Sequence, residues 1–345
     1  DPGVLLAVAM LPTLGLDGLQ GVGGTMAFDA GQFDDILQIH LLLENPRSGV
    51  FEILALAPGE SAPEPWVPAD VMRYTTFHWE FKRSFKAFQT LFDSIRGEGA
   101  LAAGIQRRIN EPLDTDLVET ILPSLEGRVT YVNWIEHPAT ITSQATLVAL
   151  KLKDADPIRK VLETVSSKSP ETLVRQTFSD KAYYQINPGS RNRSPAPDTP
   201  PRPRPRPCFG ILGDYFIFTD RASLFEKVIA TGENPAESLG EALDYRLVAS
   251  KIARRIRGKK AAMLGFLRPD EGLRFLYEMA GADRTRERLR GEAERNPFFK
   301  TLNSALESHP LPPFEVLQRY FAPGGSVAID DETGLHLTVF SLRRK

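Results

Sequence analysis

The chain has 345 residues, with 42 lysines plus arginines against 44 aspartates plus glutamates, so its formal net charge is −2. This balance argues against a dedicated nucleic-acid-binding protein, which normally carries a strong basic excess. A hydrophobic fraction of 42% and a charged fraction of 25% are ordinary for a globular protein. They exclude a wholly disordered chain, a collagen-like repeat and a polytopic membrane protein.

The chain has a single cysteine, Cys208, which excludes an intramolecular disulfide and a cysteine-based zinc cluster. Residues 4–11 are apolar but lack a basic flank, so they match a signal peptide poorly. No apolar run reaches the roughly 18 residues that a membrane-spanning helix needs. We therefore expect no membrane span, and we identify no signal peptide within this sequence.

In chain order, pairs of apolar strands separated by short turns predict β-hairpins. The predicted hairpins join 23–29 to 35–43, 129–135 to 143–152, 173–178 to 182–186, 208–212 to 215–219, and 327–330 to 335–341. Residues 21–24, the run Gly-Val-Gly-Gly, precede the first of them. No helix follows this run that could direct its amides at a phosphate, so we interpret it as a structural turn.

Five apolar strands are each followed by a helix with an apolar period of three to four residues. These helices are predicted to begin near residues 50, 81, 156, 221 and 269. Asp, Asn or Pro at several of the junctions is typical of a helix start. The pattern predicts an α+β fold of mainly antiparallel sheets, built from repeated ββα units with helices packed on one face.

A longer-range similarity suggests duplication. A strand near Met72 leads through helices to a hairpin, and a strand near Met263 does the same. The sequence therefore predicts two pseudo-duplicated halves. The predicted segments are 1–60 as the end of an upstream repeat unit, 61–187 as the first half, 188–207 as a surface loop and 208–345 as the second half. The loop alternates Pro with Arg, which favours an extended backbone, and residues 58–68 form a second, softer break.

The sequence contains none of the common phosphate-binding, dinucleotide-binding, metalloprotease or nucleophile-elbow motifs. We assign no catalytic residue, no metal ligand and no cofactor. None of the five histidines lies within four residues of another, although side chains far apart in the sequence can still converge. His78 is the least ordinary of them. A cluster of His78, Glu80 and a further carboxylate in a deep pocket would favour an enzyme.

One candidate surface is basic, and it is a possible site for an anionic partner. It comprises Arg202, Arg204 and Arg206 with Arg254, Arg255 and Arg257. The last three end a helix predicted to begin near Glu237, where cations also complement the helix dipole. The surface is thus either a patch for an anionic partner or a solvated helix end. Cys208, beside the Pro-Arg run, is either a reactive thiol or a small core residue.

Several segments resemble an uncharacterised group of large secreted proteins from planctomycete-type bacteria. The segments that carry this resemblance are 128–132, 143–153, 211–220, 297–302 and 331–334. Nearly the whole chain shares it, and the chain also resembles a broader bacterial domain of unknown function built from strand and helix repeats. The resemblance implies an extracytoplasmic location, periplasmic or secreted, behind a signal peptide upstream of this chain, and it carries over no catalytic residues.

From these observations we expect a non-enzymatic extracytoplasmic binding, scaffold or assembly protein. Its partner would be another protein or an anionic polymer or headgroup, and a homo-oligomer is left open. One alternative is a hydrolase-type enzyme with a site between the halves. The other is a carrier of an apolar ligand in a cavity lined by Phe85, Phe88 and Phe92. A flat sheet surface with exposed apolar side chains would favour assembly.

Overall fold

The computed structural model of the chain describes residues 14–140, 142–187, 206–281 and 312–343, with the single residues 297, 301, 304 and 308. The strands are β1 (Leu19–Ala30), β2 (Phe33–Leu43), β3 (Arg73–His78), β4 (Leu125–Ile135), β5 (Gln144–Leu152), β6 (Leu173–Phe178), β7 (Lys181–Ile186), β8 (Cys208–Leu212), β9 (Tyr215–Thr219), β10 (Met263–Leu267), β11 (Gly324–Asp331) and β12 (Gly334–Leu342). The longer helices are α3 (Phe81–Arg96), α7 (Asp156–Lys168), α8 (Ala222–Glu233), α9 (Leu243–Ile256) and α10 (Pro269–Gly281). Shorter helical segments are α2 (Gly49–Ile53), α4 (Ala100–Ile105), α5 (Glu111–Leu113), α6 (Leu122–Ser124) and α13 (Phe314–Gln318).

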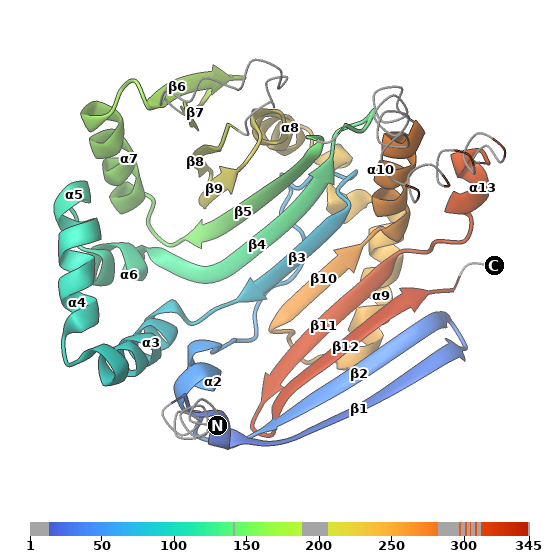
Figure 1. Cartoon of the computed structure of the whole chain (residues 1–345), viewed down its shortest axis with the longest axis horizontal. Helices are drawn as coiled ribbons and strands as arrows, with labels where there is room; N and C mark the ends of the chain where they lie inside the picture. Colours follow the sequence, from blue (N-terminus) through green and yellow to red (C-terminus); the bar gives the residue numbers. More distant parts are fainter. Residues whose placement is uncertain are drawn as a thin grey trace.

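The described strands form one twelve-stranded sheet in the order β1-β2-β12-β11-β10-β3-β4-β5-β9-β8-β7-β6. Each pair of neighbouring strands is antiparallel. The α+β class and the antiparallel pairing predicted from the sequence are confirmed, and each predicted hairpin is present. The sheet runs without interruption through strands of the predicted segments 1–60, 61–187 and 208–345 (Figure 1).

The glycine run at 21–24 is part of β1, so the predicted turn is wrong. Each of these residues pairs with a residue of β2. A Cβ added to Gly24 would lie 2.9 Å from the carbonyl oxygen of Gln38. Glycine here allows a close approach of the two strands, because it removes a side chain that would meet the neighbouring backbone.

The start of the helix predicted near Glu237 is also wrong, because α9 begins at Leu243. Residues 235–241 instead form two short 3-10 turns. The amide of Ala69 donates to the carbonyl of Glu237, and the amide of Leu239 donates to the carbonyl of Val67. These bonds tie residues 235–241 to the segment 58–68, which is packed into the core rather than forming a break, since Val67 and Trp66 are 0% and 5% exposed.

One face of the sheet, here called the covered face, packs against α8 and α9. Phe225 of α8 lies against Gly210 of β8, and Ile252 of α9 lies against Gly325 of β11. The buried apolar cluster joins the inner sides of both helices to this face. In Figure 1 the strands β10 and β11 pass in front of α9, so the view is toward the opposite face.

The remaining helices lie at the ends of the strands. In Figure 1, α3 to α7 lie beyond one end of the central strands, and α10 and α13 lie beside the other end. Strands β7 and β8 are neighbours, and the amide of Ile186 donates to the carbonyl of Pro207 over 2.8 Å. No helix in the described ranges is long and apolar enough to cross a membrane.

Candidate functional site

The face of the sheet opposite α8 and α9, here called the open face, carries a continuous row of apolar side chains. Residues that pair directly across antiparallel strands point to the same face. From β2 to β8, one paired residue from each strand makes the row Ile39, Leu337, Ala328, Met263, Phe77, Val129, Leu150, Phe216 and Ile211. Ala328 and Val129 are buried among their neighbours, and the others are only half-buried.

A second row beside it is apolar at both ends and small or polar in the middle. It runs through Met26, Leu37, Val339, Ser326, Gly265, Thr75, Tyr131, Val148, Phe218, Phe209 and Tyr184. Phe218 is 40% exposed and Val339 is 36% exposed. In Figure 1 no described helix crosses the strands on this side.

The exposed face of a sheet normally carries polar side chains, which alternate along each strand with the apolar side chains of the core face. Here the outward positions of β8 and β9 are apolar as well, and so are most of those of β2 and β12, with Asp35 and Ser341 as polar exceptions. The covered face of the same strands buries Ile36, Phe340 and Ile217 in the core. Strands that are apolar on both sides are typical of sheets covered on both faces, and a large exposed apolar patch on a folded protein marks an interaction surface.

The second candidate is an open pocket of about 410 Å³ at the end of β3 and the start of α3. His78, Glu80 and Glu126 line it, together with Lys82 and Lys153. The sequence singled out His78 and Glu80, and the structure does place them in one pocket with a further carboxylate.

The contacts of these residues do not amount to acid–base machinery. His78 Nε2 lies 2.7 Å from the carbonyl oxygen of Glu60, so this nitrogen donates to the backbone. Glu80 forms an ion pair with Arg83 at 3.3 Å, and Glu126 forms one with Lys151 at 3.0 Å. Within the described part of the chain, no hydrogen bond or ion pair links either carboxylate to His78. A general base needs such an orienting partner or a nucleophile within reach.

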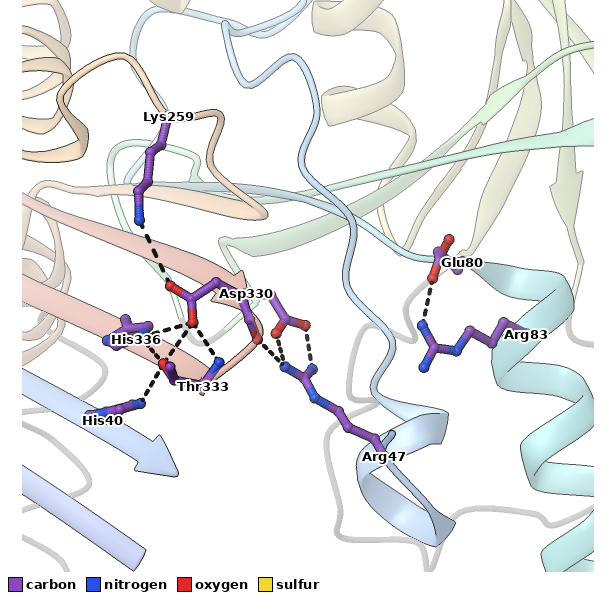
Figure 2. A network of polar contacts seen from close by, with 9 residues as sticks. His40, Arg47, Glu80, Arg83, Lys259, Asp330, Thr333 and His336 are labelled. Atoms are coloured by element: carbon purple, nitrogen blue, oxygen red, sulfur yellow. Dashed lines mark hydrogen bonds and ion pairs between the residues drawn. The ribbon is translucent and has the colours of Figure 1, made fainter. Parts of the chain in front are cut away.

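A third cluster lies at the tip of the β11–β12 hairpin (Figure 2). The rings of His40 and His336 stack with centroids 3.9 Å apart. Thr333 Oγ1 lies 3.0 Å from His336 Nε2 and donates to Asp331 Oδ1 over 2.7 Å. Burial alone would raise the pKa of Asp331, but hydrogen bonds from Thr333 and the nearby His336 hold that pKa below its usual value. Lys259 adds an ion pair at 3.8 Å.

This cluster resembles a Thr-His-Asp triad in composition but not in geometry. In a working triad the carboxylate bonds to one ring nitrogen and the nucleophile to the other. Here Thr333 and Asp331 both approach Nε2 of His336, at 3.0 and 3.3 Å. The arrangement closes a turn and does not relay a proton. No group of three or more His, Cys, Asp or Glu side chains among the described residues is arranged to hold a metal ion.

The most deeply buried charges lie on the covered face. Arg128 and Glu64 form an ion pair at 3.0 Å, with side chains 6% and 3% exposed. Thr130 donates to Glu64 over 2.5 Å, and the hydroxyl of Tyr74 donates to the same carboxylate over 3.2 Å. Burial alone would lower the pKa of Arg128, but Glu64 beside it raises that pKa above its usual value. The pair is enclosed and contributes to structure.

The described part of the predicted basic patch is spread over the sheet. Arg206 precedes β8, whereas Arg254, Arg255 and Arg257 lie at the C-terminal end of α9, which leads into β10. Five strand positions separate β8 from β10, which is roughly 24 Å at ordinary strand spacing. Arg255 lies 5.3 Å from the ring of Phe33, a cation–π contact. Arg202 and Arg204 lie outside the described residues, so the patch stays a prediction.

Cys208 is fully buried, and burial raises the pKa of its thiol to about 11. The thiolate is the reactive form, so this environment favours the core interpretation over a reactive cysteine. The predicted apolar cavity at Phe85, Phe88 and Phe92 is not seen in either described pocket. Phe88 is 41% exposed, and its ring lies 5.9 Å from that of Phe92.

Comparison with known proteins finds no matching family model, no matching curated protein and no matching solved structure. Sequence reasoning did not find the open face, because the side of a strand that a helix covers is decided by packing. It also missed the His40–His336 pair, whose strands are distant in the sequence and carry no local signal of pairing.

Proposed function

We propose that this protein is a non-enzymatic binding or assembly protein, and that a partner with apolar surface covers the open face. The observation that supports this most is the unbroken apolar row from Ile39 of β2 to Ile211 of β8. Burial of such a surface is worth roughly 25 cal/mol per Å² of apolar area, so leaving it in water is costly. An extracytoplasmic location fits this proposal, and its support is the sequence resemblance alone.

The partner class that fits best is another protein. The second row changes from aromatic residues near Phe218, through small residues near Gly265, to aliphatic residues near Val339. Side chains of different sizes give this surface raised and recessed areas. A protein partner can match them, because the cores of protein interfaces pack as closely as protein interiors.

An apolar dye tests whether the open face binds apolar groups in the folded protein. Phe218→Lys and Val339→Lys place a charge in each of the two apolar parts of the second row, at side chains already 40% and 36% exposed. We expect the wild type to increase the fluorescence of anilinonaphthalene sulfonate and each variant to lose most of this increase. Gln38→Lys is the matched control, because Gln38 is exposed on the other side of β2.

All variants should keep the melting temperature of the wild type, because each changes an exposed side chain. A wild type that does not bind the dye while folded, or a Gln38→Lys variant as defective as the others, would contradict the proposal.

A carrier of an apolar ligand is the second candidate, and the same row supports it. Native mass spectrometry of the purified protein separates the two. A lipid retained in fixed proportion, and lost on Phe218→Lys, would favour the carrier over protein assembly.

We also propose that the two halves arose from one duplicated unit. Strands β3 and β10 pair at the centre of the sheet. Each leads through helical segments to a hairpin whose first strand pairs with it, β4 in one half and β11 in the other. This matched order supports the duplication predicted from the sequence.

A further inference from the structure

The strand β1 forms one edge of the sheet, and its outer side has no partner strand within the described ranges. β1 has 12 residues, with the sequence LQGVGGTMAFDA. Natural proteins protect such edges with proline, exposed charged side chains such as lysine, bulges or short length. β1 has no proline and no lysine. Its bulge lies at the very start, between Leu19 and Gly21. Its one charged residue, Asp29, lies near the end and is paired with Arg343.

The opposite edge of the sheet is protected in two of these ways. The edge strand β6 has 6 residues and carries the exposed Arg175. β1 is twice as long and exposes large apolar side chains. Val22, Met26 and Phe28 are 64%, 58% and 70% exposed, and all three lie on the open face. An edge of this kind is a template for another strand.

We propose that β1 pairs antiparallel with β1 of a second copy of this chain, across a two-fold axis perpendicular to the sheet. This goes beyond the proposed function, because it concerns the edge of the sheet and not the partner of its open face. An axis at Gly24 places Val22 opposite Met26 of the second copy, and Met26 opposite its Val22. Residues opposite each other point to the same face, so the two open faces join into one surface.

The sequence of β1 fits this two-fold pairing. The side of β1 away from the open face carries only small residues at its centre, Gly21, Gly23, Thr25 and Ala27. A Cβ at Gly23 would meet nothing within 4 Å, so the approach of a second strand is unobstructed. Antiparallel pairing also places the two Asp29 residues at opposite ends, roughly 34 Å apart along the strands, so like charges do not meet.

A second β1 is a better occupant than the β6 edge of another copy. β6 has half the length of β1, so pairing of the two would leave half of β1 exposed. It would also be a head-to-tail contact, which continues into open filaments unless the rotation closes. Pairing of β1 with itself closes at a dimer and covers the long edge completely.

The test compares the oligomeric state of the wild type with that of a β1 double variant and of a control variant on β6. Val22→Lys with Met26→Lys places lysines opposite lysines across the two-fold axis. By analytical ultracentrifugation we expect a dimeric wild type and a monomeric double variant with unchanged circular dichroism. The matched control is Thr177→Lys on β6, which should stay dimeric. A wild type that is monomeric at its highest soluble concentration, or a double variant that stays dimeric, would overturn the proposal.

A spin label locates the contact without weakening it. In a Cys208→Ser background, a label on Thr25→Cys should show strong dipolar coupling between the two copies, and a label on Thr177→Cys should show none. A dimer without coupling at position 25 would mean that another surface joins the copies. Phe218→Lys, which tests binding at the open face, should leave the dimer intact, so failure of either proposal is seen separately.

Discussion

The ion pair of Arg128 with Glu64 is the residue-scale feature with the largest expected effect on stability. Removing one partner leaves a buried charge without compensation, which costs roughly 3–5 kcal/mol. We expect Arg128→Met to lower the free energy of unfolding by about that amount, measured by urea denaturation. Asp156→Asn breaks the exposed pair with Arg159 and should change it by less than about 0.5 kcal/mol. Equal losses in both variants would show that Arg128 and Glu64 are not buried together.

The contacts of His137 affect how the stability of the fold depends on pH, because each of its ring nitrogens faces a carboxylate. Nδ1 lies 2.9 Å from Glu278 and Nε2 lies 3.0 Å from Glu271. Burial alone would raise the pKa of Glu278, but the hydrogen bond from His137 holds it below the ordinary 4.5. A lowered native pKa stabilises the fold above about pH 4.5, and this stabilisation is lost as the pH falls through the native value.

We therefore expect the stability of Glu278→Gln to depend less on pH than that of the wild type between pH 5 and the acid limit, in parallel urea titrations. Parallel curves for the two proteins would contradict the assignment.

At the scale of elements, the β11–β12 turn depends on Gly334. Its φ is +132°, and a Cβ there would lie 1.9 Å from the carbonyl oxygen of Leu41 on β2. Gly334→Ala should therefore disturb the pairing of β12 with β2 and cost more than about 2 kcal/mol. Gly213 in the β8–β9 turn also has a positive φ, +59°, but open space around it. Gly213→Ala should cost only about 1 kcal/mol. Thermal unfolding compares the two, and a smaller loss at Gly334 would refute the close approach.

Local elements of this fold can be predicted from the sequence, but the pairing of distant strands cannot. Alternating apolar residues and turn residues lie close together in the chain, so the hairpins and α3 were predictable. The pairing of β12 with β2 and of β3 with β10 joins strands far apart, for which no local pattern exists. The glycine run at Gly23 and Gly24 has no helix after it, which indicates a structural turn, yet in the structure both residues pair with β2.

The candidate site was less predictable for a related reason. Phe218 and Val339 look like ordinary core residues in the sequence, since both lie in apolar strands. Their exposure follows from the placement of α8 and α9 on one side only, which is a property of packing. What could be stated in advance is the criterion: a sheet surface with exposed apolar side chains favours assembly over catalysis.

At the scale of the whole molecule, the central pairing of β3 with β10 binds the predicted halves into one sheet. The buried core cluster also includes residues of both, such as Leu147 and Val327. We expect calorimetry to show a single unfolding transition whose van't Hoff and calorimetric enthalpies agree. Two separate transitions would show that 61–187 and 208–345 unfold independently.

The hydrogen bond from Ile186 to Pro207 means that the chain leaves the sheet after β7 and re-enters it at nearly the same point. Any segment that joins these two points must bring its own ends together, and this closure costs conformational entropy that grows slowly with the number of residues. Each halving of such a loop returns about 0.6 kcal/mol. Replacing residues 188–205 by a two-residue turn is about three halvings, so the shortened chain should be more stable by roughly 2 kcal/mol. The number of residues between β7 and β8 would then set part of the free energy of unfolding of the whole sheet, with no change to any contact within it.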